Sequence, residues 1–314
     1  MPVIVNVLRG GDIESCHEVD VVAVDPEGRI LWSRGVGKRD VFARSALKPV
    51  QALPFVRSGA ADRFAISDER LAVACGSHGG EPRHVEVVGD WLADLGLGPD
   101  DLECGAHVPV HRASADALAA AATAPTPLHN NCSGKHAGFL SVCRQLDLDH
   151  RGYLAPGHAL QADHLTPAIE ECCGVDLAGT TPGIDGCGIP VWAMPLDRLA
   201  AGWAVLGRTD EGRRIFAAMT AQPFMVAGTD RACTRLMEAG RGAFAVKTGA
   251  EGVFCGIDLA SGAAIALKAR DGATRAADLA IEWALAELGL VPAPVPRVLR
   301  NWVGTEVGSV RVAG

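Results

Sequence analysis

Ser45 and Lys48 have the residue types and the spacing that nucleophilic catalysis can use. They are three positions apart, so one helical turn would place both side chains on the same face. A serine hydroxyl is a weak nucleophile, but a neutral amine beside it can remove its proton if burial and nearby positive charge lower the pKa of that amine. A helix N-cap serine followed by a surface lysine explains the spacing equally well. Composition favours catalysis, because only five of the 29 basic residues are lysines, and lysine can lose its proton where arginine cannot.

A second lysine stands in the tripeptide Lys247-Thr248-Gly249, at the end of a predicted strand. Serine enzymes that recognise penicillin carry S-x-x-K followed downstream by K-T-G, and their second lysine faces the nucleophile from an edge strand. A glycine at this point would let a substrate backbone approach closely. Taken alone the tripeptide is typical of a turn, so its order after Ser45 and Lys48 is what favours a site.

Ser77 offers a second hydroxyl, within the stretch C-G-S-H-G-G at 75–80. Flanking glycines would hold it in a tight turn beside His78. A helix that ends in glycine, with Ser77 only capping it, explains the same pattern.

Cys132, Lys135 and Cys187 are candidate metal ligands. The first two lie in N-N-C-S-G-K-H at 130–136 and the third in I-D-G-C-G at 184–188. Two thiolates and a neutral amine can bind Zn²⁺ tetrahedrally together with a water. C-x-x-K is not a zinc-finger spacing, however, and Cys-Gly loops are also common as ordinary turns. A phosphate-binding loop is excluded at Ser133-Gly134-Lys135, because no G-x-x-x-x-G-K frame precedes it.

The elements that must position these residues form a recognisable order along the chain. β-Branched and apolar residues at alternating or clustered positions predict strands near both ends, and helical periodicity dominates between them. The predicted strands are 2–8, 19–25, 29–36, 243–247, 253–258, 263–268 and 305–312, and the predicted helices are 45–56, 85–95, 116–123, 135–146, 158–173, 211–220 and 276–288. Strands from both ends can meet in one antiparallel sheet covered by helices. We therefore expect an α+β fold in a single domain over 1–314, with the sheet from about 1–36 and 243–314 and a helical lobe over about 37–242.

Composition limits the partners. The chain of 314 residues is 48% hydrophobic and carries a formal net charge of −8. A negative field repels nucleic acid and anionic membranes, so we expect neither as a partner. The N-terminus lacks the pattern of a signal peptide, and no run of about 18 uncharged apolar residues occurs. The sequence predicts a cytoplasmic protein whose ten cysteines are mostly reduced and buried.

Taken together, these motifs resemble the rhizobial-type L-asparaginases, the zinc-containing class 3 family. The resemblance covers nearly the whole chain. It rests on R-S-A-L-K at 44–48, C-G-S-H at 75–78, H-N-N-C-S-G-K-H at 129–136, G-I-D-G-C-G-I-P at 183–190, the strand with Lys247, and the opening L-R-G-G-D-I-E-S-C-H-E at 8–18.

The resemblance implies a fold similar to serine β-lactamases, transpeptidases and glutaminases, and a homodimer. It implies two Ser-Lys pairs, Ser45 with Lys48 and Ser77 with Lys247. It implies a Zn²⁺ ion held by Cys132, Lys135 and Cys187. Arg44 and Asp185 match positions that line the substrate site. The implied reaction is hydrolysis of the side-chain amide of L-asparagine to L-aspartate and ammonia through a seryl acyl-enzyme, with Ser45 favoured as the nucleophile because its lysine is one turn away.

Two other functions fit the residues less well. A β-lactamase-like Ser-Lys amidohydrolase acting on another amide predicts acylation by a penicillin-type reagent, but no S-D-N element is in place. A non-catalytic zinc or amino-acid sensor predicts metal binding without turnover, and it leaves the two Ser-Lys pairs without a purpose.

Overall fold

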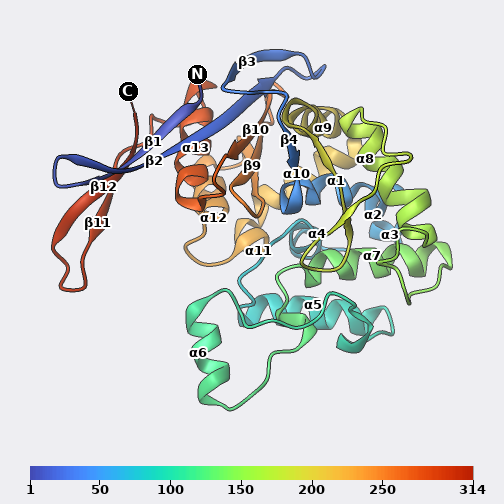
Figure 1. Ribbon diagram of the computed structural model, residues 1–314. Coiled ribbons are helices and arrows are strands. Elements are labelled where there is room, and N and C mark those ends of the chain that lie inside the picture. The colour runs from blue at the N-terminus through green and yellow to red at the C-terminus, as the bar shows by residue number, and fades with distance from the viewer. Residues whose placement is uncertain (314) are drawn as a thin grey trace.

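The computed structural model describes residues 1–313, which form an eight-stranded antiparallel sheet with helices around it (Figure 1). The strand order is β11-β12-β1-β2-β10-β9-β8, and β3 pairs with β2 off this path. The sheet thus joins N-terminal and C-terminal segments, which confirms the predicted α+β class. The strands are β1 Val3–Arg9, β2 Asp12–Val24, β3 Ile30–Arg34, β8 Phe244–Thr248, β9 Val253–Asp258, β10 Ala264–Ala269, β11 Arg297–Arg300 and β12 Glu306–Val312.

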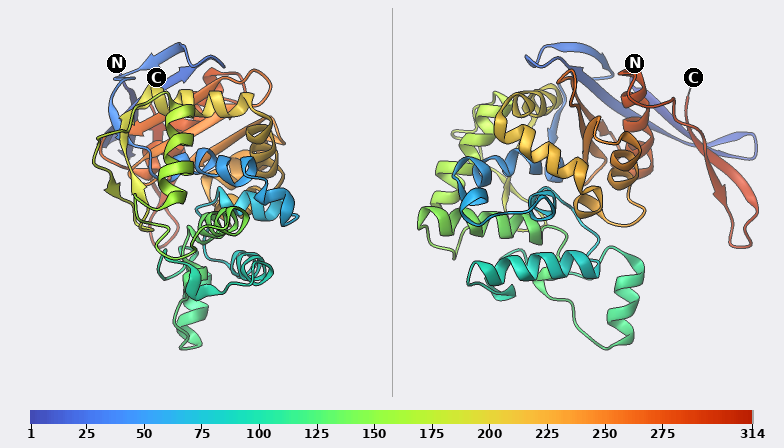
Figure 2. Two further views of the ribbon diagram at one scale, coloured as in Figure 1. Left: turned by 90° about the vertical axis from the view of Figure 1, so that its right-hand side faces the viewer. Right: turned by 180° about the vertical axis from the view of Figure 1, so that it is seen from behind.

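The centre of the sheet lies between two helices. β9 and β10 are almost wholly buried, because their apolar residues follow one another without polar alternation. α9, Leu196–Arg208, and α13, Thr274–Glu287, both pack on β2, β9 and β10, with the strands between them in both views (Figures 1 and 2). The core that results fixes β8, whose Lys247 side chain is fully buried.

The segment between β3 and β8 is mostly helical, as predicted. The helix expected over 45–56 is instead three short elements, because Pro49 and Pro54 each begin a new turn. The helices of this segment are α1 Lys48–Gln51, α2 Leu53–Arg57, α3 Ala60–Arg63, α4 Asp68–Ala74, α5 Pro82–Asp94, α6 Arg112–Ala120, α7 Ser133–Leu146, α8 Thr166–Cys173, α9, α10 Asp210–Ala221, α11 Pro223–Ala227 and α12 Ala232–Gly240. Short 3₁₀ turns lie at Arg44–Leu47 (η1), Pro99–Asp101 (η2) and Pro127–His129 (η3), and a π-helical stretch lies at Leu160–Leu165 (η4).

Two small sheets complete the fold. β4, Asp40–Phe42, pairs with β7, Ala193–Pro195, and β5, Gly183–Ile184, pairs with β6, Pro190–Val191. The outer ends of β1–β2 and the hairpin β11–β12 project together away from the helices (Figure 1), which is why the first residues of β2 are exposed. No helix among residues 1–313 is long and apolar enough to cross a membrane.

Glycine packing brings the site-bearing segments into close contact. A Cβ atom at Gly134, near the start of α7, would lie 2.4 Å from the carbonyl oxygen of Val73 in α4. A Cβ atom at Gly249, just after β8, would lie 3.0 Å from the carbonyl oxygen of Ala43. Only glycine permits the first approach, and a Cβ atom at position 249 would push the neighbouring backbone aside. α7 thus rests directly on α4, and the end of β8 rests on the turn that carries Ser45.

Candidate active site

Two buried lysines converge on one serine hydroxyl. The Nζ atom of Lys48 lies 3.0 Å from Ser77 Oγ, and the Nζ atom of Lys247 lies 2.9 Å from the same oxygen. Lys48 is 1% exposed, Lys247 0% and Ser77 7%. The three residues come from the start of α1, the last residue but one of β8, and the turn after α4. Ser77 therefore bridges the two lysines.

Backbone carbonyls satisfy the remaining donors of these amines. Lys48 Nζ donates to the carbonyl oxygens of Gly76 and, at 3.4 Å, of Asn131. Lys247 Nζ donates to the carbonyl oxygen of Thr248 at 2.6 Å. Unpaired amines would be costly at this depth, so these carbonyls are part of what lets two lysines be buried together.

The pKa of Lys247 is lowered to about 7, first by burial and then by the positive charge of Lys48. Near neutral pH the Lys247 amine is thus neutral in a large fraction of molecules. A neutral amine accepts a hydrogen bond, so Ser77 can donate its hydroxyl proton to Lys247 while it accepts one from Lys48. The three side chains form a continuous path along which a proton can move.

Ser45 is half-buried in η1, one turn before Lys48. Within residues 1–313 no hydrogen bond joins the Ser45 hydroxyl to Lys48. The preceding residue, Arg44, has a φ of +48°, a left-handed conformation that non-glycine residues rarely adopt. The structure thus brings Lys48 to Ser77, and Ser45 follows directly after the strained residue Arg44.

Arg44 and Asp185 form an ion pair across 141 positions, with Arg44 Nε 2.7 Å from Asp185 Oδ1. Burial alone would raise the pKa of Asp185, but the charge of Lys135, the N–H of Gly186 and the Arg44 guanidinium outweigh it, so the pKa is lowered. Asp185 is therefore a carboxylate at neutral pH. The Arg44 side chain remains 28% exposed, which leaves the pair reachable from solvent.

Asp185 and Cys187 lie in one tight turn between β5 and β6. The N–H of Asp185 donates to the carbonyl oxygen of Ile189 at 2.9 Å, and the N–H of Gly188 donates back to the carbonyl oxygen of Asp185 at 2.8 Å. Gly188 has a φ of +87°, which this turn requires and which favours glycine. The turn places a carboxylate and a thiol next to each other.

Cys132, Lys135 and Cys187 are brought together in the interior. Asn130 Oδ1 accepts the N–H of Cys132 at 2.8 Å and fixes the turn that starts α7, and Lys135 follows one helical turn later. Lys135 Nζ lies 3.0 Å from Cys187 Sγ. A hydrogen bond from Cys132 lowers the pKa of Cys187; burial opposes this shift, and Lys135 reinforces it. Cys187 is thus a thiolate.

This donor set is compatible with zinc. A thiolate, a second thiol and a buried amine are donors that Zn²⁺ accepts, although binding would require Lys135 to lose a proton. Among residues 1–313 no group of three or more His, Cys, Asp or Glu side chains has metal-binding geometry, so a metal at this point would depend on the lysine.

Several contacts at the site cannot be inferred from the spacing of residues in the sequence. Asn131 and Gly76 contribute carbonyl oxygens, which every residue type possesses. Cys233 Sγ accepts the N–H of Thr248 at 3.3 Å and so supports the end of β8 beside Lys247. Asn131 lies within a conspicuous stretch of sequence, but only the fold reveals its contact with Lys48.

The family model described as L-asparaginase II matches residues 5–312. No curated protein matches the chain. Among solved structures, a β-lactamase from Mycobacterium bovis has a TM-score of 0.43 at 17% identity, over 87% of this chain and 95% of that one. A structure from Bacteroides dorei, provisionally described as a β-lactamase, has a TM-score of 0.37 at 12% identity, over 85% of this chain and 84% of that one.

Proposed function

This chain belongs to the L-asparaginase II family, and we propose that it hydrolyses the side-chain amide of L-asparagine to L-aspartate and ammonia. The observation that carries the proposal is the pair of buried lysines, Lys48 and Lys247, that share the hydroxyl of Ser77. A structural role alone does not account for it, because burying two amines against each other is costly. Acyl transfer explains the two buried lysines, because the reaction needs a base, an acid and a route for the proton between them.

The proposed nucleophile is Ser45. A neutral Lys247 accepts a proton from Ser77, and Ser77 in turn accepts one from Lys48. Lys48 then has a free lone pair with which to remove the proton of Ser45, whose oxygen attacks the side-chain carbonyl carbon. Backbone N–H groups, that of Ser45 among them, would stabilise the oxyanion.

The leaving nitrogen receives its proton from Ser77, which is restored through the two lysines. Ammonia departs and leaves a β-aspartyl ester on Ser45. A water molecule, activated by the same lysine route, hydrolyses the ester and frees aspartate. The proton transfers among Lys48, Ser77 and Lys247 follow hydrogen bonds that are already formed, whereas the transfer from Ser45 to Lys48 requires a new one.

Arg44 and Asp185 are proposed to bind the α-carboxylate and the α-ammonium group of the substrate. They already bond each other at 2.7 Å, so a zwitterion can replace each partner with a group of the same charge. Binding would exchange one ion pair for two and would fix the orientation of the amide.

Cys132, Lys135 and Cys187 are proposed to hold a Zn²⁺ ion. A bound zinc ion supplies a fixed positive charge and an open coordination position for a substrate group. Lys135 already contributes to the lowered pKa of Asp185. Positive charge at this point thus acts on a residue proposed to bind substrate.

We also propose that the protein is cytoplasmic and that it forms a homodimer. The ten cysteines are all free thiols, which suits the reducing cytoplasm. Trp302 and Val303, at the tip of the projecting β11–β12 hairpin, are almost fully exposed, which suits a homodimer that covers apolar surface.

Ammonia release from L-asparagine and from L-glutamine tests the proposal. Release from asparagine, lost in Ser45→Ala and in Lys48→Ala, is the expected result. The exposed residues Ser33 and Lys38 supply matched controls, because Ser33→Ala and Lys38→Ala remove the same groups away from the site. A folded protein that leaves asparagine intact would overturn the proposed function.

A further inference from the structure

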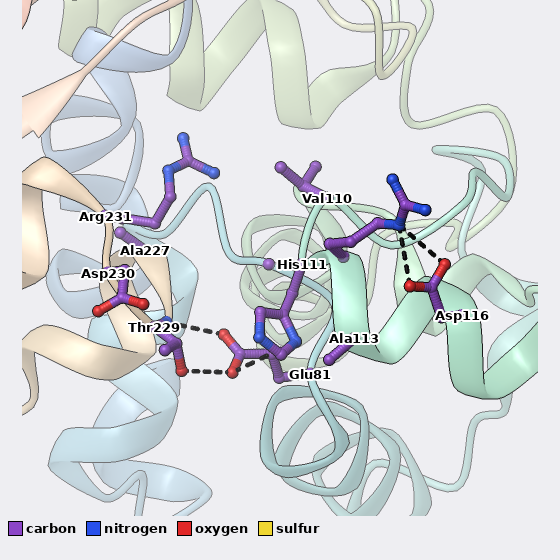
Figure 3. A pocket seen from close by; sticks show the side chains of 11 residues that line it. Glu81, Val110, His111, Ala113, Asp116, Ala227, Thr229, Asp230 and Arg231 are labelled. Atoms are coloured by element: carbon purple, nitrogen blue, oxygen red, sulfur yellow. Dashed lines mark hydrogen bonds and ion pairs between the residues drawn. The ribbon is translucent and has the colours of Figure 1, made fainter. Parts of the chain in front are cut away.

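A pocket of about 500 Å³ lies beside the Ser77 turn, and hydrolysis of free asparagine does not use it. Its walls are the turn after Ser77, the start of α6 and the loop between α11 and α12 (Figure 3). Six of its residues carry titratable or permanently charged side chains: Glu81, His111, Arg112, Asp116, Asp230 and Arg231. Such a lining suits a charged ligand.

The pocket and Ser77 share backbone segments. The N–H of Ser77 donates to the carbonyl oxygen of Val226 at 2.8 Å, and the next residue, Ala227, lines the pocket. On the Ser77 side of this contact, Gly79 lines the pocket two residues after Ser77. The pocket thus adjoins the turn that carries Ser77, the serine that protonates the leaving nitrogen in the proposed mechanism.

The loop that forms one wall is held in place. Glu81 accepts the N–H of Thr229 at 2.8 Å and its hydroxyl at 2.6 Å, and both contacts are drawn in Figure 3. A Cβ atom at Gly228 would lie 2.3 Å from Glu81 Oε1, so the loop approaches this carboxylate as closely as glycine allows. The wall is built before any ligand arrives.

One cation in this wall is not engaged. Arg112 is paired with Asp116, because its Nε lies 2.8 and 2.9 Å from the two carboxylate oxygens. Within residues 1–313, Arg231 makes no ion pair and no side-chain hydrogen bond, although it is partly buried. Its positive charge also contributes to the lowered pKa of Lys247. Arg231 is therefore an unpaired cation in the pocket wall whose charge acts on that amine.

We propose that this pocket binds the leaving group of larger substrates, so that the protein also hydrolyses β-aspartyl dipeptides, with the dipeptide carboxylate on Arg231. The inference rests on the proposed function, because it uses the same serine and lysines. In such a dipeptide the side-chain amide nitrogen carries a second amino acid in place of a hydrogen. That amino acid extends from the nitrogen that Ser77 protonates, and the pocket lies beside Ser77.

The chemistry needs only water as co-substrate. Ser45 Oγ forms a bond to the side-chain carbonyl carbon, and the bond from this carbon to the amide nitrogen breaks. The nitrogen takes a proton from Ser77 and leaves as the amine of a free amino acid. Water then cleaves the ester, so the products are one aspartate and one amino acid, with no change of oxidation state.

The test compares β-aspartyl-glycine with N4-ethyl-asparagine, which has a methyl group where the dipeptide has a carboxylate. A charged hydrogen bond is worth about 1.5–3 kcal/mol, so the wild type should favour the dipeptide in kcat/KM by about 10- to 100-fold. In Arg231→Gln this ratio should fall to within about threefold of one. Arg235→Gln, one turn further along α12, removes the same charge outside the pocket and should keep the wild-type ratio.

The outcomes separate the two proposals. Hydrolysis of asparagine without hydrolysis of β-aspartyl-glycine, or an unchanged ratio in Arg231→Gln, would overturn the pocket inference and leave the proposed function standing. Hydrolysis of the dipeptide alone, dependent on Arg231, would support the inference and overturn asparagine as the substrate. Inactivity toward both would overturn both.

Discussion

Lys247 and Ser77, 170 positions apart in the chain, are joined by a hydrogen bond of 2.9 Å. The pKa of Lys247 is about 7, so protonation near neutral pH removes the acceptor on which the proposed proton path depends. The neutral amine predominates above this pKa. We expect kcat for asparagine to rise with pH through an apparent pKa near 7 and to level off above it, in an ammonia assay from pH 5.5 to 9.

Lys247→Arg is the matched variant for that profile. Arginine keeps the positive charge but does not deprotonate, so kcat should fall by about 100-fold or more, as for the loss of an acid-base group. A wild-type kcat that stays flat down to pH 5.5 would contradict the assigned role of Lys247.

The Arg44–Asp185 pair leads to a prediction about binding. In Arg44→Gln and in Asp185→Asn one charged hydrogen bond to the substrate is lost, at about 1.5–3 kcal/mol. KM for asparagine should rise about 10- to 100-fold in each variant, with a smaller change in kcat. Initial-rate kinetics measure both constants.

Arg57→Gln is the control for these variants. Arg57 forms an ion pair with Glu171 at 2.6 Å, and both side chains are exposed, as in an ordinary surface ion pair. If Arg44→Gln alters KM no more than Arg57→Gln does, the pair does not bind substrate.

Much of the sheet was predictable because its strands have local signals. The strand predicted over 253–258 has those bounds in the structure, since a buried apolar run between turns needs no knowledge of its neighbours. α9 was not predicted. The segment has helical periodicity, with Arg198 and Arg208 exposed, but it contains Gly202, a poor helix former that lies against Cys173. The outer part of β2 was also missed, because its residues are exposed and mostly polar.

Spacing along the chain selected the candidate residues of the site but did not indicate their contacts. Ser45 and Lys48 were chosen for a spacing of one turn, yet the hydrogen bond of Lys48 is to Ser77, which α4 and the following turn bring to it. The pairing of Arg44 with Asp185 depends on two segments that only tertiary structure joins. Spacing along a chain reports neighbours within an element, and these contacts lie between elements.

Gly134→Ala should destabilise the protein. The new Cβ atom would lie 2.4 Å from the Val73 carbonyl oxygen, so α7 must move away from α4. Overpacking of this kind costs about 1–3 kcal/mol, and the shift would also disturb the turn that holds Ser77. Chemical denaturation measures the first effect, and the kcat for asparagine measures the second.

Gly157→Ala provides the comparison, because a Cβ atom there meets nothing within 4 Å. Equal free energies of unfolding for the two variants would show that α7 and α4 are not locked together at Gly134.

Cys187→Ser should lower bound zinc. Outer-shell changes at metal sites cost about 10- to 100-fold in affinity, so loss of a ligand should cost more than about 100-fold. If the metal only positions substrate, KM should rise more than kcat falls. Metal analysis of the purified protein gives the zinc content, and kinetics before and after chelation give the second result.

Cys16→Ser controls for loss of a thiol, because Cys16 is exposed on β2. A Cys187→Ser protein that retains a full equivalent of zinc through chelation would exclude Cys187 as a ligand.

The pairing of β1 with both β2 and β12 has a consequence for biosynthesis. Val5 lies opposite Val312, so one edge of β1 stays unpaired until β12 has been synthesised. Lys247 likewise arrives long after Ser77 has been made. The nascent chain therefore carries β1 with an open edge, and Ser77 without its Lys247 partner, until these later segments have been made, and chaperone binding in this interval would protect the open edge.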